Sequence, residues 1–236
     1  MSVKPAMKKR PVYDWVREGT SFLLRRDNAP LKTPAGEAYA LPTENLARKL
    51  VEEWRAQGEK PNPAQMPFTQ LAATAIDVIG KKRESIVASL AAVAASDLLC
   101  HRADEPPELL ARQVAAWQPW LDLAAQHYGA SLQAGQGIMP IVQTEASLTI
   151  LRDAVAAYDI FRLAGLQQAV GVTGSLILAL ALAEGALTVD QAFAAAELEQ
   201  LFQIEQWGED PVTTDRHASL KRELELCVAW FGALKA

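Results

Sequence analysis

The longest apolar stretch of the chain, Leu163–Ala183, reads LAGLQQAVGVTGSLILALALA and contains no charged residue. A membrane span takes about 20 apolar residues, so this length raises the question of a transmembrane helix. Four polar residues interrupt the stretch: Gln167, Gln168, Thr173 and Ser175. They make it a poor spanning segment, and we expect a protein that is not membrane-embedded. We predict instead one central helix, buried on all sides, in which Gly171, Gly174 and Ser175 let a neighbouring helix approach closely.

The segments on both sides of this stretch are also predicted to be helical, because their apolar residues recur at helical spacing between Pro, Gly and Thr signals. The expected helices cover residues 83–99, 106–129, 144–158, 188–207 and 213–234. An extended piece, residues 130–142, interrupts them and is expected to return to a sheet. The pattern as a whole predicts a helical bundle.

The first 80 residues have a different character. Short β-rich runs cover residues 12–16, 21–26 and 29–33, with turn signals at Glu18-Gly19 and Asp27-Asn28. Runs of this kind predict two or three antiparallel strands. A helix is then expected between Thr43 as its N-cap and Gly58 as its stop, and another over residues 69–80.

Both parts together predict an α+β fold with two domains. Residues 1–80 are expected to form a small N-terminal domain with an antiparallel β-sheet and helices. Residues 81–236 are expected to form a larger, all-α C-terminal domain. We place the boundary near Gly80.

Charge narrows the choice of partner. A net charge of -5 and a pI near 5.3 argue against nucleic acid or an anionic membrane, since binding either one needs a basic face. The charge is uneven along the chain. Residues 1–60 hold twelve Lys and Arg against eight Asp and Glu, whereas Leu163–Asp215 holds eight acids and no basic residue. A region of this sign would steer a basic partner.

The cysteines and the N-terminus bear on the cellular compartment. Cys100 and Cys227 have apolar neighbours and no CxxC spacing, which favours two reduced core cysteines in a reducing compartment. Met1–Arg10 is basic but leads into no apolar run, so no secretory leader is expected. These features are typical of a bacterial cytoplasmic protein or of a mature organellar one.

The acidic stretch QIEQWGED, Gln203–Asp210, begins within a predicted helix that ends at Trp207. On this helix one face is shared by Glu199, Phe202, Gln203, Gln206 and Trp207. Three functions remain open for it. The unpaired acids could meet a basic partner, the carboxylates between Glu197 and Asp210 could serve a hydrolase, or the chain could be a helical scaffold without a client. If Glu199 is exposed, Glu199→Lys is expected to weaken partner binding while leaving the fold intact.

The familiar catalytic and nucleotide-binding signatures are missing from the sequence. The stretch GVTGS, residues 171–175, has glycines but no lysine for a phosphate, and the three histidines lack metal-ligand spacing. We therefore expect no cofactor and no metal.

Several stretches together resemble one family, the chaperones that assemble the F-type ATP synthase catalytic head by holding its alpha subunit. They are LKTPAGEAYALPTENLARKLVEEWRAQGEKPNPAQMPFTQLAATAID, SDLLCHRADEPPELLARQVAAWQPW, GIMPIVQ and FQIEQWGED, which lie between Leu31 and Asp210. The resemblance implies a small N-terminal domain with a β-sheet and a larger helical domain.

The resemblance also implies a function. Family members are not enzymes; they bind the free alpha subunit and cover the surface that the beta subunit uses later. It implies a monomer in the bacterial cytoplasm, or in the mitochondrial matrix if the source is eukaryotic. The partner-binding residues it implies are Trp54, Asp77, Glu199, Gln203, Glu205, Trp207 and Gly208. For Trp54, Met66 and Trp207 the alternative is a place in the core.

Overall fold

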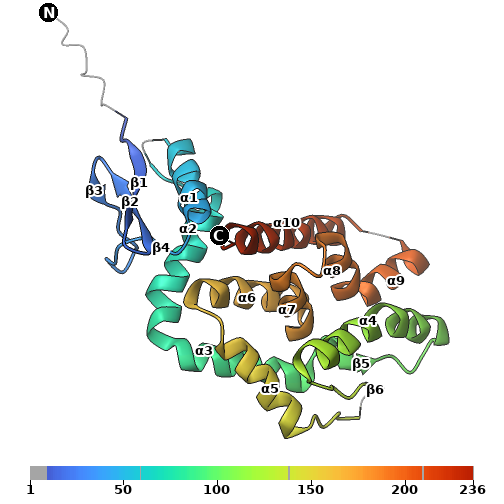
Figure 1. Cartoon of the computed structure of the whole chain (residues 1–236). Coiled ribbons are helices and arrows are strands. Elements are labelled where there is room, and N and C mark those ends of the chain that lie inside the picture. The colour runs from blue at the N-terminus through green and yellow to red at the C-terminus, as the bar shows by residue number, and fades with distance from the viewer. Residues whose placement is uncertain (1–9, 59, 138, 209, 236) are drawn as a thin grey trace, which may run out of the picture.

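A computed structural model describes residues 10–58, 60–137, 139–208 and 210–235. The expectation of no secretory leader depends mainly on residues 1–9, which lie outside the described residues. Glu209, one of the eight acids between Leu163 and Asp215, also lies outside them. Figure 1 shows a small sheet at the N-terminal end and helices through the rest of the molecule. The predicted α+β class is confirmed.

The sheet is antiparallel and has β2 at its centre. Its strands are β1 (Tyr13–Glu18), β2 (Ser21–Arg26), β3 (Ala29–Pro30) and β4 (Ala40–Leu41). Asp27 and Asn28 between β2 and β3 both have positive φ, a conformation that Asp and Asn tolerate better than most residues. Both predicted turns are present, but the third strand is shorter than residues 29–33 because its pairing with β2 stops at Pro30.

Helix α1 (Glu44–Ala56) covers this sheet with a buried stripe that includes Leu46 and Leu50. The Thr43 side chain caps the helix by accepting a hydrogen bond from the Leu46 backbone N–H, as predicted. The helix ends at Ala56 and its C-cap is Gln57, one residue before the expected stop at Gly58. The Thr43 hydroxyl also donates to the Ala233 carbonyl oxygen at 2.5 Å, which ties α1 to the last helix of the chain.

The remaining helices follow the predicted order. They are α2 (Pro67–Thr74), α3 (Gly80–Ala92), α4 (Pro107–Tyr128), α5 (Glu145–Ala156), α6 (Ile160–Thr173), α7 (Leu176–Glu184), α8 (Val189–Ala196), α9 (Leu198–Trp207) and α10 (Pro211–Ala233). Short 3-10 turns cover Pro63–Gln65, Val93–Ser96 and Leu98–Cys100. A π-helical turn, Ala75–Ile79, joins α2 directly to α3. The domain boundary near Gly80 stays a prediction.

The central apolar stretch is two helices, so the prediction of one helix is wrong. Gly174 ends α6 in the left-handed conformation with φ of 65°, and the Ser175 side chain caps α7 by accepting from the Leu178 N–H. Burial on all sides is confirmed only for α7, in which every residue except Glu184 is buried; α6 exposes Gln167 and Gly171, so the prediction is wrong there. The glycine at which a neighbour approaches closely is Gly165, against which Trp230 and Phe231 pack.

The acidic segment is likewise split. Residues 188–207 form α8 and α9, with a break at Glu197, whose φ of -103° and ψ of 16° are not helical. The break turns α9 away from the bundle, toward the outer edge seen on the right of Figure 1. Glu197 and the residues around it include no Gly or Pro, so the sequence gives no local signal for this turn.

The extended piece does not return to the N-terminal sheet. Gly135–Gln136 forms β6, which pairs in parallel with β5 (His101–Arg102) in a separate two-stranded ladder. The Gln143 amide then closes the loop with two hydrogen bonds to the backbone of Gln133, each 2.8 Å long. This segment therefore belongs to the helical part of the molecule.

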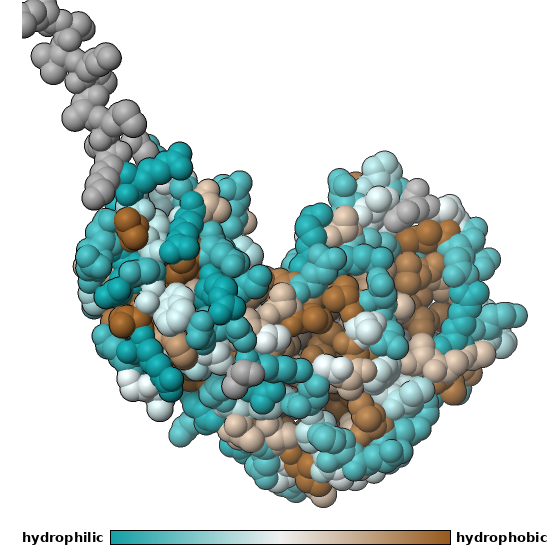
Figure 2. Space-filling view, turned by 45° about the horizontal axis from the view of Figure 1, so that its top comes forward, coloured by the Kyte–Doolittle hydropathy of each residue, from teal (hydrophilic) through white to brown (hydrophobic). Residues whose placement is uncertain are grey.

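The molecular surface is hollowed. Figure 2 shows a notch between the N-terminal part and the C-terminal helices, with hydrophobic residues on its floor and hydrophilic residues along its rims. Within the described ranges, no helix combines the length and the apolar character that a bilayer crossing requires.

The two cysteines lead to a prediction about reactivity. Cys100 and Cys227 are free and fully buried, and burial raises the pKa of each thiol to about 12. Only the thiolate reacts quickly with alkylating reagents, so neither should be labelled in the folded protein at pH 8. Mass spectrometry after iodoacetamide treatment, with and without denaturant, checks this. Rapid labelling without denaturant would contradict the buried placement.

Candidate functional site

Helix α9 carries most of the predicted partner-binding residues. Leu198 and Phe202 are buried and hold the helix against the bundle. Glu199, Gln203, Gln206 and Trp207 are all exposed, and we call these four residues the α9 face. The predicted stripe is thus confirmed except for Phe202, which points inward because its position anchors the helix.

Trp207 ends α9 and is 79% exposed, so the alternative of a core position is wrong for this residue. It is correct for Met66, which is buried. Gly208 follows with φ of 86° and ψ of 167°, which glycine alone adopts readily, and its N–H donates to the Ile204 carbonyl. Gly208 therefore turns the chain and leaves the indole of Trp207 at the tip of the helix.

Gln113 on α4 fixes the carboxylate of Glu199. The Gln113 side chain is fully buried, and its Oε1 accepts a hydrogen bond from the Ala103 backbone N–H at 2.8 Å. Its Nε2 must then face the other way, where it donates to Glu199 Oε1 at 2.7 Å. Because a buried donor without an acceptor costs about 1–3 kcal/mol, this amide requires an acceptor at position 199.

Arg112, the preceding residue of α4, forms a second link to α9. Its guanidinium lies 2.6 Å from Glu205 Oε2 and covers the ring of Phe202, with 5.1 Å from the guanidinium carbon to the ring centroid. The Glu205 carboxylate is therefore half of a surface ion pair. Its predicted role in partner binding stays a prediction.

Glu197, at the break between α8 and α9, is buried and bound by two neighbouring residues of α10. The Arg216 guanidinium donates a hydrogen bond to each carboxylate oxygen, and His217 Nε2 lies 3.3 Å from Oε2. The carboxylate in turn raises the pKa of Arg216. These contacts fix the turn that carries α9 away from the bundle.

The acids of Leu163–Asp215 are less unbalanced in space than in sequence. Four of them pair with basic residues just outside that range or on α4: Glu184 with Arg162, Asp190 with Lys221, Glu197 with Arg216 and Glu205 with Arg112. Asp210 caps α10, and hydrogen bonds from Thr213 lower its pKa. The interpretation of the whole stretch as uncompensated is wrong, because basic residues just beyond its two ends and Arg112 on α4 supply the partners.

Trp54 and Asp77 lie at the other end of the molecule, near α1 and α2 (Figure 1). Trp54 is half-buried and packs on Tyr13, with 5.3 Å between ring centroids. Asp77 accepts hydrogen bonds from the Thr33 hydroxyl at 2.6 Å and the Ala35 N–H at 3.1 Å. Both residues join the sheet to the helices, and no contact brings them to the α9 face.

The carboxylates between Glu197 and Asp210 that the structure describes do not form a pair suited to acid–base catalysis. Glu197, Glu199 and Glu205 each face a different partner, as described above, whereas such chemistry needs two acids directed at one substrate. Among the described residues, no group of three His, Cys, Asp or Glu side chains has the geometry to hold a metal ion. The arrangement presents an acidic and aromatic surface for contact.

Comparisons with known proteins identify the family of the chain. The family model for the ATP12 chaperone protein matches residues 7–125. The crystal structure of Atp12 from Paracoccus denitrificans is 33% identical, covers 94% of this chain and 96% of its own, and superposes with a TM-score of 0.90. An Asp-to-Lys mutant of the same protein gives 33% identity, 94% and 95% coverage, and a TM-score of 0.91.

A third structure, of an Agrobacterium tumefaciens protein described as a candidate chaperone, is 36% identical. It covers 94% of this chain and 84% of its own, with a TM-score of 0.89. The family model stops within α4, and each of the three structural matches covers 94% of the chain. The chain therefore belongs to the ATP12 chaperone family, whose members are non-enzymatic factors for the assembly of F1-ATPase.

Proposed function

We propose that the protein is an ATP-independent chaperone that binds the unassembled alpha subunit of F1-ATPase and prevents its aggregation until it pairs with beta. It acts as a monomer, in the bacterial cytoplasm or, in a eukaryote, in the mitochondrial matrix. Family membership supports an ATP synthase subunit as client. The choice of alpha comes from the resemblance of the motif blocks between Leu31 and Asp210.

The observation that carries the proposal is the α9 face. The face joins an exposed tryptophan to a fixed carboxylate about two helical turns away, and aromatic side chains of this kind are common anchors of protein interfaces. Glu199 supplies the negative charge that a basic client surface would meet. The negative charge of the neighbouring segment supports steering of such a client.

The experiment is gel filtration and calorimetry of the purified protein with isolated alpha subunit, at low and high salt, with isolated beta subunit as the control. We expect a one-to-one complex with alpha, weaker at high salt because exposed charges are screened. Complex formation with beta and not with alpha would contradict the choice of client. A hydrolase would instead turn over substrates from an ester and glycoside panel.

Removing the indole of Trp207 should separate binding from folding. Because Trp207 is largely exposed, Trp207→Ala should change the free energy of unfolding by less than about 0.5 kcal/mol. Loss of an aromatic anchor should weaken binding of the alpha subunit by about 2 kcal/mol, or roughly thirtyfold. Calorimetric titration beside a thermal melt measures both. Val142→Ala, at a site that is 85% exposed, is the control and should alter neither.

A further inference from the structure

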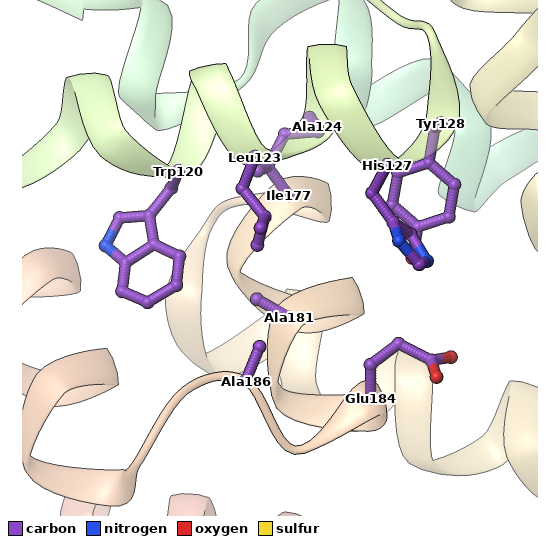
Figure 3. Close-up of a pocket in the computed structure, with 9 residues that line it drawn as sticks. All are labelled: Trp120, Leu123, Ala124, His127, Tyr128, Ile177, Ala181, Glu184 and Ala186. Atoms are coloured by element: carbon purple, nitrogen blue, oxygen red, sulfur yellow. The ribbon is translucent and has the colours of Figure 1, made fainter.

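A small apolar pocket lies between α4 and α7, separate from the α9 face. Its volume is about 80 Å³. Figure 3 shows Trp120 at one end and His127 and Tyr128 at the other, with Ala181 and Ala186 across from them. Glu184 is the one carboxylate among the lining residues, and it lies on the far wall below the rings of His127 and Tyr128. The pocket thus joins apolar walls, three aromatic rings and one acid.

Two helices end at the side of the pocket where Glu184 lies. Tyr128 is the last residue of α4 and Glu184 the last of α7, and both helices are closed by a left-handed glycine. The C-terminus of a helix carries roughly half a negative charge. Two such ends beside a carboxylate favour a cation at this end of the pocket.

The Glu184 carboxylate has one oxygen to spare. The Tyr158 hydroxyl donates to Oε1 at 2.7 Å, and Arg162 approaches the same oxygen at 3.8 Å while it stacks on the Tyr158 ring. In the described part of the chain, no side chain or backbone N–H donates a hydrogen bond to Oε2. Lys235, whose Nζ lies beside Gly185, is the other nearby cation.

We propose that this pocket receives a lysine or arginine side chain of the client. The aliphatic stem of such a residue would lie along the apolar walls, and its charged head would meet the aromatic rings and Glu184. A purely apolar side chain would bring no donor to Glu184 Oε2, since the Tyr158 hydroxyl and Arg162 both approach Oε1. The inference rests on the proposed function for its choice of client. The pocket would give the client a second contact beside the α9 face, because the pocket and the α9 face both lie along α4.

The pocket can be tested without the client. The probe is Nα-acetyl-lysine methylamide or its arginine analogue, and the readout is the NMR signal of the Trp120 indole N–H, assigned with Trp120→Phe. Nα-acetyl-norleucine methylamide is the control, since it keeps the stem and lacks the charge. We expect saturable shifts with the basic probes and at least a threefold weaker effect with norleucine, the order expected for one exposed charge contact. Equal shifts with norleucine, or no shift with any probe, would overturn the proposal.

The second arm measures the affinity for isolated alpha subunit. Glu184→Gln keeps an acceptor for Tyr158 and should weaken binding about threefold to tenfold. The control Glu225→Gln removes the same charge from an exposed position of α10 and should change nothing. If wild-type protein binds alpha and Glu184→Gln binds equally well, the client does not use the pocket. If wild-type protein fails to bind alpha, the proposed function is wrong, and the probe titration still decides whether the pocket selects cations.

Discussion

Replacing Gly165 by alanine is expected to lower the free energy of unfolding by roughly 2 kcal/mol. An added Cβ would lie 2.6 Å from Trp230 Cδ1 and 2.8 Å from Phe231 Cε1, closer than real side chains approach. Neither ring can move easily, because both are buried and the Trp230 indole donates to the Phe161 carbonyl at 2.9 Å. Overpacking of a core typically costs about 1–3 kcal/mol, and the better helix propensity of alanine recovers only part of it.

The matched control is Gly171→Ala in the same helix. A Cβ at Gly171 meets nothing within 4 Å, so this variant should be unchanged or more stable by up to about 1 kcal/mol. Urea titration of the two variants and the wild type measures the difference in the free energy of unfolding. Because both variants replace glycine by alanine in α6, the gain in helix propensity cancels when the two are compared. Equal stabilities would mean that α10 does not pack on α6 as closely as described here.

The second large effect is on binding. Glu199→Lys places a cation where a basic client surface is expected, and like charges across an interface cost several kcal/mol, so the affinity for the alpha subunit should fall more than a hundredfold. The structure also revises the expectation that this substitution spares the fold. Loss of the acceptor for the buried Gln113 amide should lower the free energy of unfolding by about 1–3 kcal/mol.

Glu199→Gln distinguishes these two effects. It keeps an oxygen that can accept from Gln113 while it removes the charge, so the thermal melt should stay close to that of the wild type. Binding should weaken less than with lysine, since the charge is lost and not reversed. A melt as low as that of Glu199→Lys would show that Glu199 acts in folding, and normal binding by both variants would move the interface elsewhere.

Local signals account for what the sequence predicted well. Thr43 before an amphipathic run and the Asp27-Asn28 turn each specify a cap or a turn through their own backbone and side-chain chemistry. Gly174 and Ser175 are local signals of the same kind: Gly174 ends α6 in the left-handed conformation, and Ser175 caps the start of α7. The lack of any charged residue in Leu163–Ala183 concealed these signals, because a buried helix and a buried helix–turn–helix have the same composition.

Contacts between distant residues account for what could not be predicted. Glu199 and Gln113 are 86 positions apart, and Glu205 and Arg112 are 93 apart. No rule of sequence spacing links the residues of these pairs. The sequence alone therefore leaves the acids of α9 without partners and does not indicate that the buried Gln113 amide fixes Glu199. The break at Glu197 could not be predicted either, because the contacts that hold it come from another helix, α10, through Arg216 and His217.

Photo-cross-linking tests most directly whether the client lies on the α9 face. Benzoylphenylalanine in place of Trp207, or in place of Val142 as an equally exposed control, is irradiated in the presence of isolated alpha subunit. We expect a chaperone–alpha adduct from position 207, competed away by unlabelled wild-type protein, and little adduct from position 142. Adduct from position 142 with none from position 207 would contradict it.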